Sequence, residues 1–346
     1  MSDSLFDTPF IGAPMAGGTS TAALVQAVHD GGGFGFLAAG YKSPTAMTAD
    51  IAAAKALGIR FGMNVFVPDM VQLAPSSETK ARLAAYRAML EPEAARFGVP
   101  LPALRFDDDD AWRDKIHALL EDPVEAVSFT FGLPGRDVVR ALQKAGSRVI
   151  SSVTSVAEAL AAAEEDPDAL VVQHASAGAH SAAFLAADRS AVSQAAGTTA
   201  ELVAQVRAAV GLPLIAAGSI MGGSDLSKVL AAGAVAGQIG TALVRTPESG
   251  ARQLHKDALG DPAFTQTTMT RAFTGRWARA LVNDFVRDHE DAPEGYPAIH
   301  HLTSSIRAAA SAAGDPHRLN LWAGTGWRSA GTRPARVVVS EFLSGL

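Results

Sequence analysis

The sequence contains no cysteine among its 346 residues. Disulfides, cysteine-ligated zinc, iron–sulfur clusters and a thiolate nucleophile are therefore excluded. Aromatic residues make up only 6% of the chain and charged residues 18%, whereas hydrophobic residues make up 48%, a composition that excludes a disordered chain. The net charge is −6, so we expect no general nucleic-acid-binding surface, which would be basic.

Long apolar runs are also missing. No stretch of about 18 consecutive apolar residues occurs, so no membrane span is predicted. The first residues, MSDSLFD, lack the basic and apolar regions of a secretion signal. These absences predict a cytoplasmic globular protein without a nucleic-acid or membrane partner, and they leave an oligomer open.

Short apolar runs are present, and they alternate with alanine-rich stretches of helical pattern. Their nearly continuous apolar character is typical of parallel strands that are buried on both faces. Eight such strand–helix units favour an α/β fold of the (β/α)8 TIM-barrel type over a doubly wound sheet. The eight runs are 10–13, 33–39, 59–67, 126–131, 148–153, 169–172, 214–217 and 237–243.

Two segments interrupt the repeat. Residues 68–122 separate the third and fourth runs by more than a normal crossover, and they are predicted to hold one helix over 78–97 and another from near Asp107. In the second helix, the acidic run 107–110 is interpreted as a helix start. The chain after 245 is predicted to be mostly helical. We therefore expect a barrel domain from 1–67 and 123–245, and a helical lid or substrate region from 68–122 and 246–346.

Polar side chains follow several runs at the end of the barrel where active sites lie. Asn64 lies in the closing part of the third run, and a buried amide there needs a partner, either a ligand or backbone. Gln173 and His180 follow the sixth run. A histidine titrates near neutral pH, so His180 is a candidate catalytic acid or base. His174, directly after the strand, is the alternative candidate for this role.

Glycine-rich segments form the ends of the seventh and eighth strands, where TIM barrels bind phosphate through backbone N–H groups. This pairing predicts a phosphorylated ligand or cofactor. Metal-ligand spacings are missing from the sequence, so no metal is expected. The candidate phosphate-site residues are Gly218, Ser219, Gln238, Ile239, Gly240 and Thr241.

Seven short segments, in order, together resemble the nitronate monooxygenase family from about residue 9 to about residue 328. The resemblance implies an FMN-dependent (β/α)8 barrel with a helical lid. It also implies oxidation of alkyl nitronates, such as propionate 3-nitronate, by flavin and O₂. The segments are APMAG (13–17), GMNVF (62–66), QHASAGAH (173–180), AAGSI (216–220), QIGTA (238–242), TPES (246–249) and TRAFTGR (270–276).

The same resemblance implies roles for single residues. Met15, Asn64, Gln173 and Gly178 would lie along the flavin ring and ribityl chain, and the glycine-rich segments would hold the phosphate. His180 matches the active-site histidine of the family, which is proposed to take a proton from nitroalkanes. Tyr296 lies in a Tyr-Pro segment where some members place a substrate-contacting tyrosine.

One departure concerns the loop around the histidine. The family often has Gly-Gly-His-Arg-Gly there, whereas this chain has GAHSA over 178–182 and so lacks the arginine. The loss of that charge bears on the identity of the substrate more than on the cofactor. Two alternatives stay open: an NAD(P)H-dependent flavin reductase of the quinone or enoyl-ACP reductase type, and a non-catalytic module that binds FMN or another phosphate.

Overall fold

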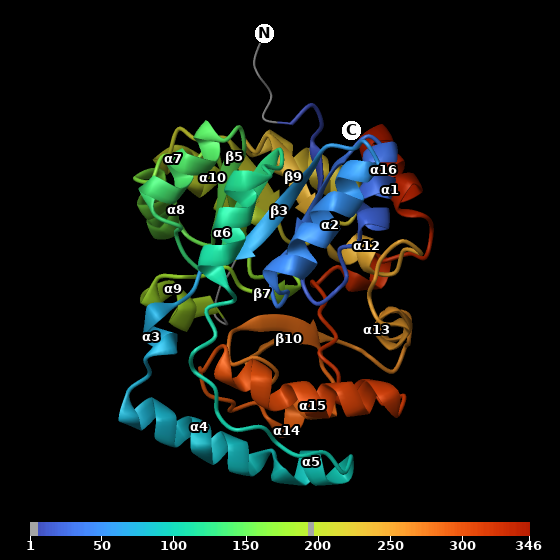
Figure 1. Cartoon of the computed structure of the whole chain (residues 1–346). Helices are drawn as coiled ribbons and strands as arrows, with labels where there is room; N and C mark the ends of the chain where they lie inside the picture. Colours follow the sequence, from blue (N-terminus) through green and yellow to red (C-terminus); the bar gives the residue numbers. More distant parts are fainter. Residues whose placement is uncertain (1–5, 193–196) are drawn as a thin grey trace.

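The computed structural model describes residues 6–192 and 197–346, so the start of the segment examined for a secretion signal lies outside it. Parallel strands form a closed barrel surrounded by helices, which confirms the predicted (β/α)8 fold (Figure 1). Each predicted apolar run overlaps one barrel strand. In barrel order these are β1 (Phe10–Gly12), β2 (Phe34–Ala38), β3 (Phe61–Phe66), β4 (Ala126–Thr130), β5 (Arg148–Val153), β6 (Ala169–Gln173), β8 (Leu214–Ala217) and β9 (Ala236–Ile239).

The eighth run is shorter as a strand than predicted. The backbone of Gly240 has φ −113° and ψ −67°, which ends β9, and the helix α12 (Thr241–Val244) follows. Ala242, Leu243 and Val244 are buried in the core, so the apolar run continues through the change of structure. Continuous apolar residues do not distinguish a buried strand from a buried helix.

Helices surround the barrel. Several of them begin at a Ser or Thr whose side chain accepts a backbone N–H from the first turn, for example Ser43 and Ser155. The helices that follow the strands directly or after an insertion are α1 (Ala22–Asp30), α2 (Pro44–Ala56), α6 (Trp112–Glu121), α7 (Arg136–Lys144), α8 (Val156–Ala163), α10 (Thr199–Ala209) and α11 (Gly223–Ala231).

The helix α16 (Ala335–Ser344) completes this ring, because it packs between α11 and α1. The ring of Phe342 meets that of Phe10 edge-on at 5.2 Å. Gly31 lets the two helices approach closely, since a Cβ there would lie 2.6 Å from the Cβ of Val339. The outer helix of the eighth strand–helix unit is therefore separated from β9 by a long insertion.

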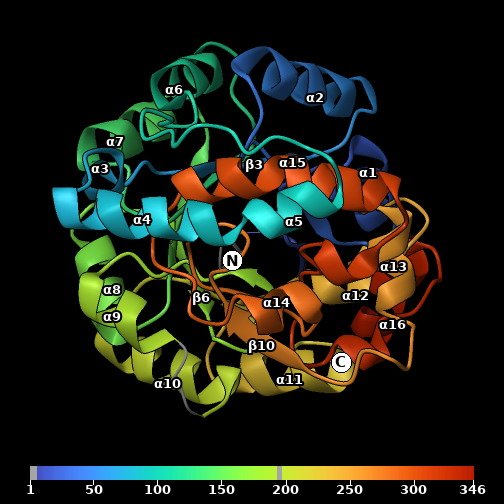
Figure 2. The same ribbon diagram turned by 90° about the horizontal axis from the view of Figure 1, so that it is seen from below.

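Two segments form a lid over the carboxyl ends of the barrel strands (Figure 1). Seen from that side, α4 and α5 follow one another across the barrel, and α15 runs alongside both (Figure 2). The first segment holds α3 (Met70–Leu73), α4 (Ser77–Met89) and α5 (Glu91–Arg96). The second holds α13 (Gln253–Ala258), β10 (Thr267–Thr270), β11 (Ala278–Leu281), α14 (Asp284–Asp288) and α15 (Ala298–Ala312), and α9 (Ala186–Ala191) lies between β6 and α10.

The lid contains a small antiparallel sheet that the sequence interpretation missed, having expected a mostly helical region. Its strands are β10, β11 and β7 (Ala179–His180), with β11 in the middle. His180 pairs with Ala278 across this sheet. A two-residue strand whose partner lies far along the chain produces no alternating or apolar run, so no local sequence pattern predicts it.

The helices of the first insertion also differ from the prediction. The stretch 78–97 is two helices, because Pro92 lacks the N–H that would continue α4 and instead lies in the first turn of α5. The next helix, α6, begins at Trp112 and not near Asp107. Asp110 and Ala111 have φ of 58° and 53°, a left-handed conformation that no α-helix contains.

Candidate active site

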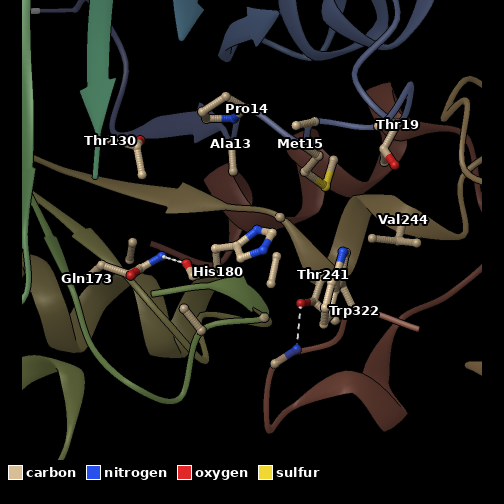
Figure 3. Close-up of a pocket in the computed structure, with 18 of the residues that line it drawn as sticks. Ala13, Pro14, Met15, Thr19, Thr130, Gln173, His180, Thr241, Val244 and Trp322 are labelled. Carbon is tan, nitrogen blue, oxygen red and sulfur yellow. Dashed lines mark hydrogen bonds between the residues drawn. The ribbon is translucent and has the colours of Figure 1, made fainter. Parts of the chain in front are cut away.

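A cavity of about 400 Å³ lies at the carboxyl ends of the barrel strands, beneath the lid. Its volume falls within the usual range for cofactor and small-molecule sites. Strand ends form one wall, and the segment 319–326 and the helix α15 contribute to the other. Figure 3 shows His180 inside it, between Gln173 and Thr241, with Met15 and Trp322 nearby.

The structure brings most of the predicted site residues together in this cavity. Ile239 is not among the lining residues: its side chain packs in the barrel core, and its carbonyl accepts the Ala13 N–H at 2.9 Å. Tyr296 lies outside too and lines a small second cavity. The lining residues among those predicted are Met15, Asn64, Gln173, Gly178, His180, Gly218, Ser219, Gln238, Gly240 and Thr241.

Close backbone approaches form the glycine-rich end of the cavity. A Cβ on Gly178 would lie 2.6 Å from the backbone nitrogen of Gly324, and one on Gly218 would lie 2.9 Å from the Oγ of Ser176. Gly218 also has φ +123°, which side chains rarely adopt. The Thr241 hydroxyl accepts the Gly324 N–H at 3.0 Å. This cradle of small residues and backbone amides suits a phosphate ester.

The side-chain amides of the buried Asn64 and the partly buried Gln173 are held by protein groups. Asn64 Nδ2 donates to Ser128 Oγ at 2.9 Å and to Thr130 Oγ1 at 3.0 Å. Gln173 Nε2 donates to the His180 carbonyl at 3.0 Å, while Gln173 Oε1 accepts the Ala182 N–H at 2.7 Å. Gln173 thus fixes the backbone of the segment that carries His180, through the carbonyl of His180 and the N–H of Ala182.

The backbone of His180 is fixed by several elements. The residue before it, Ala179, has φ +63°, and β7 pairs with β11. The N–H of Ser181 donates to the Trp277 carbonyl at 2.8 Å. His174, the rival candidate, lies outside the cavity lining, with its Nδ1 2.9 Å from the Ser176 hydroxyl.

The imidazole of His180 lies among aromatic rings and one hydroxyl. Its Nε2 is 2.9 Å from the Oγ1 of Thr274. The rings of Trp322 and Phe131 lie 5.3 and 5.6 Å away. Burial and, to a lesser extent, the nearby charges of Arg276 and Arg307 lower the pKa of His180 to about 3. The imidazole is therefore neutral near pH 7 and can accept a proton.

The cavity is electropositive. Arg252 and Arg307 line it, whereas no aspartate or glutamate does among the described residues. The Arg307 guanidinium donates to Thr303 Oγ1 at 3.1 Å and to the His300 carbonyl at 2.9 Å, and no described carboxylate pairs with it. A buried cation without a counter-ion favours an anionic ligand.

Sequence reasoning missed Arg307, Thr274 and Trp322. Arg307 had a signal, because it is a single arginine within the alanine- and serine-rich stretch that forms α15. Thr274 lies inside a quoted family segment, but its contact with His180 depends on the missed sheet. Among residues 6–192 and 197–346, no group of three or more side chains could hold a metal, and no helix is long and apolar enough to span a membrane.

Comparisons with known proteins indicate the family to which this chain belongs. The model of the nitronate monooxygenase family matches residues 1–345. A probable nitronate monooxygenase of Staphylococcus aureus strain MSSA476 is 33% identical over 341 residues, covering 97% of this chain and 93% of the relative. The structure of nitroalkane oxidase from Streptomyces ansochromogenes has a TM-score of 0.93 and 43% identity, covering 99% of this chain and 96% of that one.

A more distant likeness concerns the fold alone. FabK from Thermotoga maritima has a TM-score of 0.73 and 23% identity, covering 99% of this chain and 93% of its own. The family match and the relatives above extend over nearly the whole chain, including the barrel, the lid and the cavity. This chain therefore belongs to the nitronate monooxygenase family and is an oxidoreductase enzyme.

Proposed function

We propose that this enzyme binds FMN and oxidises alkyl nitronates, and nitroalkanes after deprotonation, with O₂. The observation that carries the proposal is the charge of the cavity: arginines and three neutral histidines line it, and no described carboxylate does. Such a cavity favours two negative groups, a phosphate at the glycine-rich end and a nitronate near His180.

The glycine-rich cradle supports FMN as the cofactor. Backbone groups near Gly218, Ser219 and Gly240, together with the Thr241 hydroxyl, would hold its phosphate, and Met15 and Gly178 would lie along the rest of the molecule. Bound FMN would supply the electron transfer and the reaction with O₂, which no side chain of this cysteine-free chain can supply. We further propose that residues 1–67 and 123–245 form the FMN-binding domain, with 68–122 and 246–346 as the lid region, although α16 packs on the barrel.

The side chains divide the work with the substrate. A nitronate is already an anion, so Arg307 and Arg252 attract it and no base is needed. A neutral nitroalkane must first lose a proton from carbon. The neutral histidines His180, His255 and His300 line the cavity, and we assign the proton acceptor to His180 because it matches the position of the family's active-site histidine. Turnover of a nitronate therefore depends on binding and oxidation alone, whereas turnover of the corresponding nitroalkane also depends on proton abstraction.

The test uses the purified protein and the variant His180→Asn. We expect flavin absorbance and released FMN from both proteins. The variant should lose about 10²- to 10⁴-fold in kcat/KM with nitroethane, as expected for removal of a general base, and keep its turnover of ethylnitronate. His117→Asn, at an exposed site on α6, is the matched control and should behave like the wild type.

Two results would contradict the proposal. A protein that neither contains nor takes up FMN would remove the cofactor assignment. Equal turnover of nitroethane by the wild type and His180→Asn would show that His180 is not the base. The same preparation tests the reductase alternative: rapid bleaching of the flavin by NADH under anaerobic conditions, without nitronate oxidation, would favour a reductase.

A further inference from the structure

We propose that Thr274 is a positioning residue for His180. Its hydroxyl fixes the neutral imidazole with the proton on Nε2, which leaves the lone pair of Nδ1 facing the cavity as the proton acceptor. The proposal deepens the proposed function and rests on it, because only an enzyme that deprotonates nitroalkanes needs this base.

The position of Thr274 supports this role. It lies in the turn between β10 and β11, beside β7, and only 2% of the residue is exposed. Its Oγ1 is 2.9 Å from His180 Nε2, and no other hydrogen bond to this ring comes from the described residues. Nδ1 is not among the buried atoms that lack a partner, and His180 lines the cavity, so Nδ1 is the nitrogen open to a substrate.

The neighbours of the hydroxyl determine its direction. A threonine has one hydroxyl proton to donate. Thr274 Oγ1 donates to the Arg276 carbonyl at 3.3 Å and accepts the Arg276 N–H at 3.4 Å. Among the described residues, no other donor reaches that carbonyl, which belongs to a buried residue. With this proton committed, Thr274 faces Nε2 as an acceptor, and Nε2 must carry the imidazole proton.

The reverse arrangement is less favourable. If Thr274 donated to Nε2, the buried Arg276 carbonyl would lose its donor, which carries a desolvation penalty. Nδ1 would then carry the proton, and the nitrogen facing the cavity could no longer accept one. The hydrogen bonds around Thr274 therefore favour the tautomer that is competent as a base.

The proton transfer is balanced without any further reactant. The C–H bond next to the nitro group breaks, and its proton forms a bond with Nδ1. The electron pair stays with the substrate and moves into the nitro group, giving a nitronate. Nε2–H continues to donate to Thr274 Oγ1, so the same hydrogen bond also stabilises the imidazolium.

The kinetic test compares Thr274→Val, which removes the hydroxyl at nearly constant volume, with Thr274→Ser, which retains it. Thr274→Val should lower kcat/KM for nitroethane about 10- to 100-fold, a part of the full effect of a general base, while ethylnitronate turnover changes by less than about threefold. Thr274→Ser should restore most of the nitroethane activity. Thr268→Val, on β10 and outside the cavity lining, is the matched control.

Equal losses with both substrates, or no rescue by serine, would show a merely structural role and overturn the proposal. A second measurement does not depend on activity. In protein labelled with ¹⁵N-histidine, the His180 signals, assigned by their absence from His180→Asn, should show a protonated Nε2 and an unprotonated Nδ1. A protonated Nδ1 would overturn the assignment of Thr274, whereas a wild type that oxidises neither substrate would overturn the proposed function alone.

Discussion

The left-handed backbone conformation recurs among the residues around the cavity. Tyr41, Phe131, Ala179 and Ser219 have φ of 68°, 81°, 63° and 52°, and all four line it. Bulky residues rarely adopt this conformation, and such strain is concentrated at functional sites. The surrounding fold therefore holds these side chains in place at a cost in stability.

Gly218 offers a test of the cradle at the scale of one residue. Gly218→Ala would force a Cβ to within 2.9 Å of Ser176 Oγ at φ +123°. We expect a destabilisation of about 1–3 kcal/mol and at least about tenfold weaker FMN binding. Thermal unfolding and fluorescence titration with FMN measure the two effects. Gly211→Ala, where the new Cβ meets nothing within 4 Å, is the control, and a Gly218→Ala protein with wild-type affinity would contradict the cradle.

The sequence predicted which single residues reach the cavity better than it predicted their contacts. Glycines and polar residues after apolar runs were found because the barrel places all strand ends on one side. The hydrogen bonds of Gln173 and Asn64 to protein groups were not predictable, because their partners come from other strands and loops. The roles of Met15, Gly178 and the other cofactor residues stay predictions.

At the scale of elements, a buried ion pair connects the first insertion to the barrel. Asp110 Oδ2 is 2.7 Å from the ammonium of Lys115 on α6, and its Oδ1 accepts the Tyr41 N–H at 3.0 Å. Lys115 is fully buried and donates to the Ala39 carbonyl at 3.0 Å. Asp110, the last residue of the acidic run 107–110, thus anchors the segment that follows β2, a role that the interpretation of the run as a helix start did not include.

Removing one partner of this pair should be costly. Lys115→Met leaves the largely buried Asp110 carboxyl, whose pKa burial already raises to about 6, without its counter-ion, so we expect a loss of about 1–3 kcal/mol in the free energy of unfolding. The double variant Lys115→Met, Asp110→Asn should recover much of this loss, because asparagine keeps an acceptor for the Tyr41 N–H. Urea unfolding measures both. A double variant less stable than Lys115→Met would contradict the account.

Strands and helices differed in how well the sequence predicted them. The barrel strands were found because each is buried on both faces and so reads as an apolar run. The sheet of β7, β10 and β11 was missed because β10, Thr-Thr-Met-Thr, carries no apolar run and β7 is two residues long. Long-range pairing, not local sequence, specifies this sheet and with it the position of His180.

At the scale of the whole molecule, buried histidines make stability depend on pH. Burial lowers the pKa of His255 to about 4 and that of His180 to about 3, and it lowers the pKa of His300 and His289 as well. Each folded-state pKa lies below the unfolded value of about 6.5, so the unfolded chain binds more protons at acidic pH. The stability from these neutral histidines is complete above pH 6.5 and is lost as the pH falls toward 4.

We therefore expect the free energy of unfolding to fall by up to about 1.4 kcal/mol per pH unit for each of His255 and His180 between pH 6 and pH 5. His255→Gln, which removes one group, should reduce this slope by about that amount. His117→Gln at an exposed site is the control. Urea unfolding at a series of pH values gives the slopes, and an unchanged slope in His255→Gln would show that this residue is not neutral in the folded protein.

The position of α16 has a consequence for protein synthesis. The lid precedes α16 in the chain, so a ribosome makes every barrel strand and the whole lid before it makes the helix that covers β1. Until then the surface between α11 and α1 is uncovered, and apolar groups such as Phe10 lack their contact with α16, where Phe342 lies. Exposed apolar surface of this kind is a substrate for chaperones and proteases. A chain interrupted within the lid would therefore be recognised and degraded through this exposed apolar surface, although it already contains the complete barrel sheet.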